Sequence, residues 1–392
     1  MLSFNNSMKT IILSQQIYTP HQFLENTAIQ IQDGKILALI ASDQVKLFPD
    51  FEIIRAEKFT ITPGLIDIHT HGAMNADAMD ATLESLNIMS EFYAVHGITA
   101  FYPTTMAAGE NETYKALENV VQNKDKVTFA QVLGVHLEGP YLCQEFKGAQ
   151  PSNALRLADK REYEKWFASG LASLITVAPE LAGSQELIKY GVERGTEFAI
   201  GHSAASYAEV IRAADLGVRQ ATHTFNGMKG LNHREPGTVG GILSDDRIYA
   251  QVIADGVHIH PAVVKLIIRA KGIHRTILIT DSMKAAGLKD GDYDLGSLVI
   301  KVTNGVPRTL SGGLAGSTLT LDQAVRNVMN FAQISFQDAI RMATYSPAEA
   351  MRIQDRKGQI QPGADADLTF FDETYHVSAT MIKGKLVYGK IK

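Results

Sequence analysis

Apolar and polar residues alternate along the first part of the chain, over residues 10–62, and Asp33 and Gly34 mark a turn within it. An alternation with a period of two predicts half-buried β-strands, because successive side chains of a strand point to opposite faces. The same β character returns near the C-terminus, where 368–371 and 386–388 read as strands. Both ends of the chain are therefore expected to be built from short strands.

Between these ends, short runs rich in Ile, Val, Leu and Thr alternate with longer segments of helical period. Eight apolar runs predict strands, at 65–69, 99–102, 132–137, 173–177, 198–201, 221–224, 250–253 and 276–280. Helical segments are predicted at 83–93, 113–121, 160–167, 185–192, 207–214 and 261–270, with a shorter candidate at 238–243. Strands that alternate with helices favour parallel βαβ units, and eight of them favour a TIM-like (β/α)8 barrel of the α/β class.

The segment that follows the last barrel run is different. Residues 287–316 are rich in Gly and Asp and predict an inserted hairpin and loop, with helices after it at 319–331 and 336–342. The chain is thus expected to hold two domains. One is a small β-sandwich made from residues 1–62 and 348–392, and the other is a catalytic barrel over residues 63–347.

Length and charge agree with this division. The 392 residues suit a barrel of ~250 residues plus a smaller unit. The net charge of −5 gives no reason to expect a nucleic-acid partner or a charged membrane surface. The apolar run 10–13 is too short for a signal sequence or a membrane span, and the single Cys143 allows no intrachain disulfide, so a cytoplasmic location is expected. Residues 1–7 read as an extension before a second plausible start at Met8.

Candidate chemistry begins at the end of the first barrel strand, in the sequence His69-Thr70-His71. Residues i and i+2 of a strand point the same way, so both imidazoles can face the barrel mouth and share a cation. Active sites of barrels lie at the carboxyl ends of the strands. A His-x-His sequence alone is a weak indication of a metal site, since two histidines at the surface or in the core that bind no metal have the same spacing.

Four other predicted strand ends strengthen the metal interpretation. They carry Glu138, His202, His223 and Asp281. Glu138 stands just before Gly139-Pro140, where a core role explains a carboxylate poorly and where its two oxygens could bridge two ions. His136, in phase with Glu138, is interpreted as supporting or structural. Unpaired, these buried groups would be costly, and a divalent cation offsets that cost. Ligands without thiolate suit Zn, Fe or Mn, as one or two ions per chain.

Several motifs together carry a family resemblance. The chain resembles the amidohydrolase superfamily in PGLIDIHTH at 63–71 and in GQIQPGADADL at 358–368. Within it, the chain looks like the branch that deacetylates N-acetylglucosamine 6-phosphate. That likeness rests on HLEGP at 136–140, GHS at 201–203, THTFNGM at 222–228, REPG at 234–237, DGVH at 255–258, TD at 280–281 and LAG at 314–316. The motifs follow the family's order, so the resemblance covers most of the chain.

The resemblance implies roles for single residues. Glu138, His202 and His223 would hold the main metal. Asp281 would be the catalytic acid/base, which takes a proton from a metal-activated water and passes it to the departing amine. Contacts to the sugar phosphate would come from Ala149, Gln150, Asn226, Gly227, Arg234, His258, Leu314, Ala315 and Gly316. Arg234 would grip the phosphate, because its planar donors match phosphate oxygens. The expected products are glucosamine 6-phosphate and acetate.

One position departs from the family pattern. Many members have His where this chain has Gln150, a position that helps to polarise the acetyl carbonyl, and glutamine cannot carry a proton there. A second metal could take over this role. His69 and His71 would hold it, with Glu138 as a bridge and Asp281 completing the site.

Two other interpretations stay open at this stage. The chain could be another amidohydrolase, acting on a different N-acyl or cyclic amide substrate. It could also be a catalytically inactive barrel, although such a chain should have lost one of Glu138, His202, His223 or Asp281. The expected partner is a small phosphorylated amino sugar, with no nucleic acid and no membrane. The resemblance further implies a homodimer whose phosphate site lies near the subunit contact.

Overall fold

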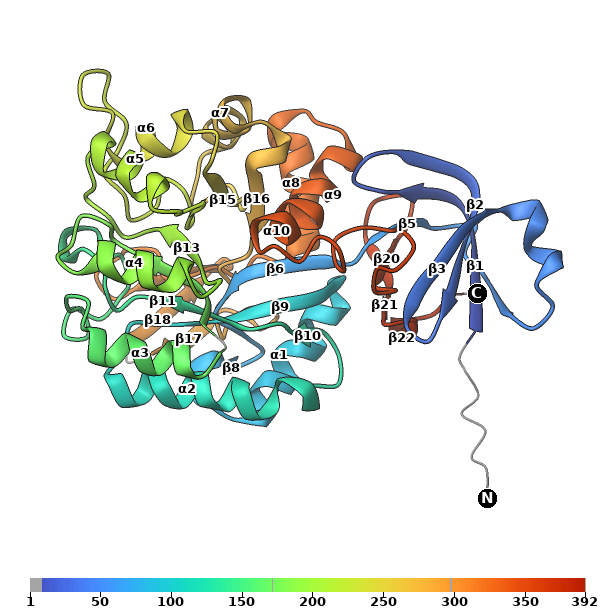
Figure 1. The fold of residues 1–392 in the computed structure, drawn as a ribbon, viewed down its shortest axis with the longest axis horizontal. Helices are drawn as coiled ribbons and strands as arrows, with labels where there is room; N and C mark the ends of the chain where they lie inside the picture. Colours follow the sequence, from blue (N-terminus) through green and yellow to red (C-terminus); the bar gives the residue numbers. More distant parts are fainter. Residues whose placement is uncertain (1–8, 171, 297, 392) are drawn as a thin grey trace.

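The computed structural model describes residues 9–170, 172–296 and 298–391. The predicted extension at 1–7 lies outside these residues. A large unit of strands and helices is joined to a smaller β unit, which lies at the right of Figure 1. Among the described residues, no helix is long and apolar enough to cross a membrane.

Eight parallel strands form the wall of the larger unit. They are β6 (Leu65–Thr70), β9 (Ile98–Thr105), β11 (Val135–Glu138), β12 (Ala172–Val177), β13 (Glu197–Ile200), β14 (Gln220–Ala221), β15 (Tyr249–Ile253) and β16 (Thr276–Ile279). Each pairs with the next in this order. The remaining gap, between β16 and β6, is bridged at the carboxyl end, where the Asp281 amide donates to the His69 carbonyl at 2.9 Å. The predicted TIM-like barrel is confirmed.

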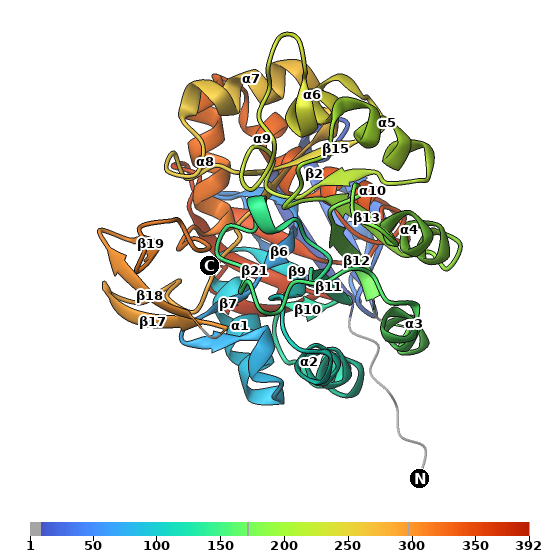
Figure 2. The same ribbon diagram turned by 90° about the vertical axis from the view of Figure 1, so that its left-hand side faces the viewer.

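Helices surround this wall, as Figure 2 shows in a view toward the barrel. They are α1 (Leu83–Val95), α2 (Glu110–Asn123), α3 (Lys160–Ala168), α4 (Ser184–Val192), α5 (Tyr207–Asp215), α6 (Gly237–Ser244), α7 (Pro261–Lys271), α8 (Leu321–Ala332), α9 (Phe336–Ala343) and α10 (Tyr345–Ala350). All predicted helical segments are confirmed, including the short candidate at 238–243. Burial explains the pattern: the apolar stripes of the helices pack on the strands in one large core.

Two predicted strands are shorter than expected. The run 132–137 is divided into β10 (Gln131–Val132) and β11, with Gly134 between them. The strand predicted at 221–224 is wrong beyond Ala221, where β14 (Gln220–Ala221) ends. The chain leaves the extended conformation at His223, whose φ is 30°. That departure turns the His223 side chain into the barrel mouth.

The inserted segment carries the predicted hairpin. β17 (Gly291–Leu295), β18 (Leu298–Thr303) and β19 (Val306–Thr309) form an antiparallel sheet beside the barrel mouth. A smaller hairpin, β7 (Gly72–Ala73) and β8 (Ala76–Asp77), follows the first barrel strand. A separate apolar cluster ties the insert to the barrel, with Met106, Met283 and Leu295 among its members. The insert therefore forms one wall of the mouth.

The smaller unit is a mixed sheet of eight strands drawn from both ends of the chain. They are β1 (Lys9–Tyr18), β2 (Phe23–Gln32), β3 (Lys35–Ala41), β4 (Glu52–Arg55), β5 (Thr60–Pro63), β20 (Leu368–Phe371), β21 (Val377–Ile382) and β22 (Lys385–Gly389). The two ends meet where β5 pairs with β20. The small β domain is confirmed, and its strands form one continuous sheet rather than two. The domain limits at 62/63 and 347/348 stay a prediction.

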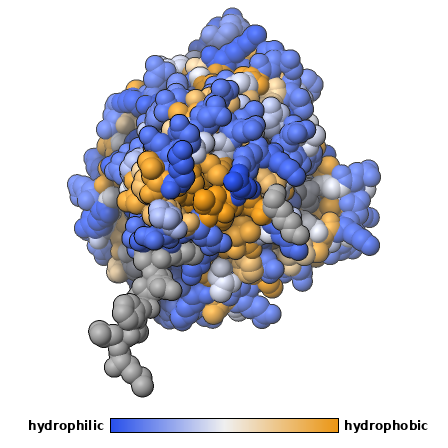
Figure 3. Space-filling model, turned by 90° about the vertical axis from the view of Figure 1, so that its right-hand side faces the viewer, coloured by the Kyte–Doolittle hydropathy of each residue, from blue (hydrophilic) through white to orange (hydrophobic). Residues whose placement is uncertain are grey.

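One apolar cluster is shared by the N-terminal and C-terminal halves of this sheet, and Ile29, Ile61 and Phe370 belong to it. Figure 3 views the molecule from this end and shows hydrophobic residues gathered in the middle of the face. Leu37 and Ile53 are exposed apolar residues of the small domain. The sheet thus has an apolar core of its own. It lies at one end of the molecule, and it does not cover the mouth of the barrel.

Candidate functional site

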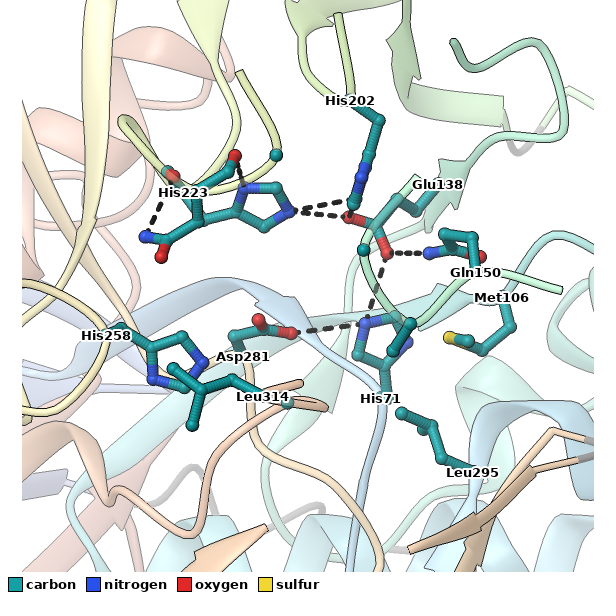
Figure 4. A pocket seen from close by; sticks show the side chains of 15 residues that line it. His71, Met106, Glu138, Gln150, His202, His223, His258, Asp281, Leu295 and Leu314 are labelled. Carbon is teal, nitrogen blue, oxygen red and sulfur yellow. Dashed lines mark hydrogen bonds and ion pairs between the residues drawn. The ribbon is translucent and has the colours of Figure 1, made fainter. Parts of the chain in front are cut away.

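The six predicted metal-binding side chains meet at the barrel mouth. His69 and His71 come from the end of β6, Glu138 ends β11, and His202, His223 and Asp281 follow β13, β14 and β16. Figure 4 shows five of them, with the imidazoles and the two carboxylates turned toward a common centre. All six are buried, with at most 7% of each residue exposed. The convergence predicted from the strand ends is therefore found.

The backbone makes this convergence possible by turning sharply after three strands. His202, His223 and Asp281 have positive φ angles of 47°, 30° and 51°. Such angles are uncommon for residues with a side chain, and they persist where surrounding contacts hold them. Two backbone hydrogen bonds hold Asp281. Its amide donates to the His69 carbonyl at 2.9 Å, and its own carbonyl accepts from the Ser317 amide at 2.7 Å. The strained turns point the side chains inward.

Two groups of ligand atoms share one carboxylate. His69, His71 and Glu138 form one group, and Glu138, His202 and His223 form the other, with the atoms of each group within 4.8 Å of one another. Oε1 of Glu138 lies 3.0 Å from Nε2 of His223 and 3.2 Å from Nε2 of His202. Its Oε2 lies 3.3 Å from Nε2 of His71. Glu138 thus presents Oε1 to His202 and His223 and Oε2 to His71. Nε2 of His69 lies 3.6 Å from Oε1.

The outer ring nitrogens of three histidines settle which atom faces the centre. Each Nδ1 lies beside a backbone carbonyl: His202 by Phe146 at 2.9 Å, His223 by Asn226 at 3.1 Å and His71 by Thr104 at 3.1 Å. A carbonyl can only accept, so Nδ1 carries the proton and donates it. In a neutral ring, Nε2 then presents a lone pair to the centre.

These lone pairs make the centre fit a divalent cation. The Nε2 atoms of His202 and His223 are 3.2 Å apart, and both face the Glu138 carboxylate. Lone pairs and a carboxylate repel one another unless positive charge lies between them. Imidazole nitrogens and carboxylate oxygens are ligands that Zn, Fe and Mn accept. The donor set therefore fits a divalent metal, and its identity is not fixed by the ligands.

The carboxylates are held in their charged form. Burial alone would raise the pKa of Asp281, but His69 and His71 oppose it and hold the pKa below its ordinary value. The pKa of Glu138 is lowered in the same way, against burial, by the histidines around it. Burial would lower the pKa of His71, but Asp281 and Glu138 raise it. The centre thus attracts positive charge, which a metal ion can supply in place of protons.

Two buried residues support the metal-binding histidines from beneath. The His136 ring lies 4.7 Å from that of His69, and its Nε2 is 2.7 Å from Oγ1 of Thr176. Burial lowers the pKa of His136, so this ring is neutral. Asp67 accepts hydrogen bonds from the His69 amide at 3.2 Å and from the Thr280 hydroxyl at 2.5 Å. It therefore fixes the strand ends that carry His69 and Asp281.

A cavity of about 170 Å³ opens beside the metal ligands. Seven of the predicted substrate residues line it: Ala149, Gln150, Asn226, Gly227, His258, Leu314 and Gly316. The amide group of Gln150 is fixed, because it donates to Oε2 of Glu138 at 2.7 Å and accepts from the Ala107 amide at 2.8 Å. His258 is held by Asp255, with Nδ1 2.7 Å from its carboxylate.

Two predicted substrate residues are placed elsewhere. Ala315 is buried between two residues that line the cavity, and its own side chain is not part of the lining. Arg234 lies on the exposed segment 230–235 and is absent from the lining residues. Sequence reasoning also missed residues that do line the cavity, namely Met106, Gly148 and Leu295. An apolar or small residue outside a motif gives no signal of such a role.

The sequence of this chain is similar to those of known hydrolases. The model of the Amidohydrolase family matches residues 60–387. An N-acetylglucosamine-6-phosphate deacetylase of Vibrio furnissii is 37% identical over 378 residues, which cover 96% of this chain and 94% of the relative. An N-acetylgalactosamine-6-phosphate deacetylase of Escherichia coli O157:H7 is 35% identical over 97% of this chain and 99% of its own.

Among solved structures, a mutant N-acetylglucosamine-6-phosphate deacetylase of Mycobacterium smegmatis, in complex with N-acetylglucosamine 6-phosphate, has a TM-score of 0.90. It is 29% identical, covering 97% of this chain and 99% of that one. The chain belongs to the amidohydrolase family. Within that family, it falls among the N-acetylglucosamine-6-phosphate deacetylases.

Proposed function

We propose that this chain hydrolyses the N-acetyl group of N-acetylglucosamine 6-phosphate to acetate and glucosamine 6-phosphate. The observation that carries the proposal is the shared carboxylate of Glu138 between two histidine pairs, beside a cavity that His258 also lines. The relatives from Vibrio furnissii and Mycobacterium smegmatis, whose names state this substrate, support it.

Glu138, His202 and His223 would hold one divalent ion, and His69 and His71 would hold a second with Glu138 and Asp281. A metal bound there lowers the pKa of water toward neutrality and polarises a carbonyl oxygen. Gln150 cannot supply the polarising group freely, because both ends of its amide are already engaged. This arrangement favours two ions over one.

Asp281 is the proton carrier in this proposal. Its carboxylate faces the centre, and the neighbouring histidines lower its pKa and so hold it in the charged form, which is the form that can accept a proton from the attacking water. The oxygen of that water forms the new bond to the acetyl carbon. Asp281 then returns the proton to the amide nitrogen as the carbon–nitrogen bond breaks, which releases the free amine.

The other end of the cavity suits the phosphorylated part of the sugar. Burial would lower the pKa of His258, but the Asp255 carboxylate raises it, which favours a cationic ring. Asn226 and Gly227 line the same cavity as His258. In Figure 4, His258 and Leu314 lie at the opposite side of Asp281 from Met106 and Gln150. An anion is better placed at His258 than beside the carboxylates.

A substrate panel tests this proposal. Acetate release is measured with N-acetylglucosamine 6-phosphate, N-acetylgalactosamine 6-phosphate and unphosphorylated N-acetylglucosamine. The first substrate is expected to have the highest kcat/KM. A higher value for the galactosamine substrate would favour a second candidate function, which the relative from Escherichia coli O157:H7 suggests. Activity on cyclic amides with none on the panel would refute the proposal.

Arg234 would reach the phosphate from a second copy of the chain. It lies outside the cavity of its own chain, on an exposed segment that also exposes Leu231 to 59%. A leucine so exposed is explained if the segment is covered on association. We therefore keep the expected homodimer as part of the proposal, with the segment 230–235 at the contact.

Substitution of Arg234 by Ala is expected to raise KM for the phosphosugar roughly tenfold or more, because a charge-assisted contact is lost. Activity on the unphosphorylated sugar should barely change. Arg269→Ala, an exposed arginine of α7, serves as the control. Equal losses on both substrates would mean that Arg234 is structural.

A separate experiment tests whether Arg234 of one copy serves the site of the other copy. Arg234→Ala chains are mixed and reassembled with Asp281→Asn chains. Mixed dimers then hold one site with both groups intact, so activity is expected to recover above that of either variant alone. No recovery, or a fully active monomer in light scattering at the assay concentration, would contradict the dimer proposal.

A further inference from the structure

Met106 stands between two cavities. It follows β9 directly at the barrel mouth, and it is 3% exposed. On one side it lines the cavity beside the metal ligands. On the other it lines a larger cavity of about 580 Å³. Among the described residues that line these two cavities, Met106 is the one common to both. Its side chain is therefore the partition between them.

The chemistry of the substrate decides which group meets this partition. The acetyl group on C2 and the phosphate on C6 leave opposite ends of the sugar ring. The carbonyl carbon has to lie near Asp281 and the metal ligands, while the phosphate belongs at His258. The acetyl methyl points away from the ring, and so it continues past the reacting carbon toward the side where Figure 4 places Met106 and Leu295.

The wall on that side is apolar, as a methyl group requires. Met106 and Leu295 belong to one buried apolar cluster, and Ala149 packs against it. Gly296, next along the chain, lines the second cavity, where an added Cβ would lie 3.9 Å from Met106. The insert and the end of β9 thus approach each other at Met106.

The second cavity offers room, and three of the charged residues that line it, Asp80, Lys284 and Asp294, are paired with one another. Small and apolar residues line the part next to Met106 in sequence, including Ala107, Ala108 and Gly109. Lys284 pairs with Asp80 at 3.1 Å and with Asp294 at 2.7 Å. An acyl chain that entered here would meet open space, and these paired charges need no partner from it.

We propose that Met106 limits the length of the N-acyl group that the enzyme accepts, and that the second cavity is a subsite for longer acyl chains once Met106 is shortened. This inference rests on the proposed deacetylation. A methionine suits such a partition, because its unbranched chain fills an irregular gap and adapts to its neighbours. Acetyl fits in front of it, and a butyryl chain collides with it.

The test compares N-acetyl, N-propionyl and N-butyryl glucosamine 6-phosphate as substrates. One methylene in an apolar pocket typically changes kcat/KM by roughly 10- to 200-fold. The unchanged enzyme is therefore expected to prefer acetyl over butyryl by on the order of 100-fold. Met106→Ala is expected to reduce this preference to about tenfold or less, with kcat/KM for butyryl rising and that for acetyl falling.

Two matched variants separate the partition from general loosening. Met79→Ala removes the same atoms from a residue that lines the second cavity without lining the first, so the acyl preference should stay. Met106→Leu keeps the volume and should also keep the preference. If Met106→Ala does not fold, Met106→Val removes less of the side chain and is expected to raise the propionyl rate.

The outcomes distinguish the two proposals. An unchanged acyl preference in Met106→Ala, or in Met106→Val if that variant replaces it, overturns the role of Met106. An equal shift in Met79→Ala overturns it as well. Failure of the unchanged enzyme to release acetate from N-acetylglucosamine 6-phosphate would instead defeat the proposed function, and the same assay reports it.

Discussion

Replacement of Asp281 by Asn is expected to lower kcat by ~10²-fold or more, the usual scale for the loss of a general acid–base. Asparagine keeps the size of the side chain but cannot accept and return a proton. Glu138, His202 and His223 remain in this variant, so at least one ion per chain should stay bound. The variant should also keep the fold, because the hydrogen bond from the amide of residue 281 to the His69 carbonyl does not involve the side chain.

The measurement is steady-state kcat together with metal content and a thermal melt on the same sample. Asp292→Asn is the control, since it changes an exposed carboxylate of β17 far from the proton path proposed here. Near-normal turnover by Asp281→Asn with metal retained would refute the assignment. Loss of all metal would show that Asp281 acts as a ligand first.

The second large effect concerns the number of metal ions. The chain is expected to bind close to two ions at saturating metal, and His69→Gln with His71→Gln is expected to reduce this to one. Glu138, His202 and His223 already complete one set of three ligands, which with water is the usual catalytic arrangement. His71 faces the other oxygen of Glu138. His69 lies 3.6 Å from the first oxygen, and both His69 and His71 also face Asp281.

Activity should fall with the second ion, because an ion held by His69 and His71 would help to polarise the acetyl carbonyl. Gln150 cannot replace the lost electrophile, since the Ala107 amide and Glu138 hold its amide group at both ends. Adding Gln150→His to the double variant should restore part of the activity.

Metal content per chain, measured against saturating metal, checks this prediction. His274→Gln, an exposed histidine away from the barrel mouth, serves as the control and should keep both ions. A wild-type content of one ion per chain with full activity would refute the two-metal interpretation. It would leave the deacetylase proposal intact, because the first set of ligands would still be complete.

The sequence predicts the barrel well because its strands are buried on both faces and read as apolar runs. It predicts the metal ligands for a related reason. A histidine or carboxylate directly after such a run stands at the mouth of the barrel, as His71 and Glu138 do. Burial and strand direction are local properties, and a single sequence displays them.

Other features depend on contacts that a sequence pattern does not display. The positive φ angles of His202, His223 and Asp281 are imposed by neighbouring strands, so the short β14 was not foreseen. Met106 and Leu295 meet across a long separation in the chain, and neither belongs to a motif. Arg234 belongs to a motif, but the motif does not indicate whether its side chain lies at the cavity of its own chain or at that of a second copy.

Acetate release from N-acetylglucosamine 6-phosphate, with metal content quantified on the same sample, tests the central claim most directly. The enzyme is stripped with a chelator and then titrated with Zn, Fe or Mn in separate series. The account predicts no acetate without metal and a release that rises with the bound ions, one acetate for each glucosamine 6-phosphate formed. Metal-independent release, or a fully loaded enzyme that releases no acetate, would contradict it.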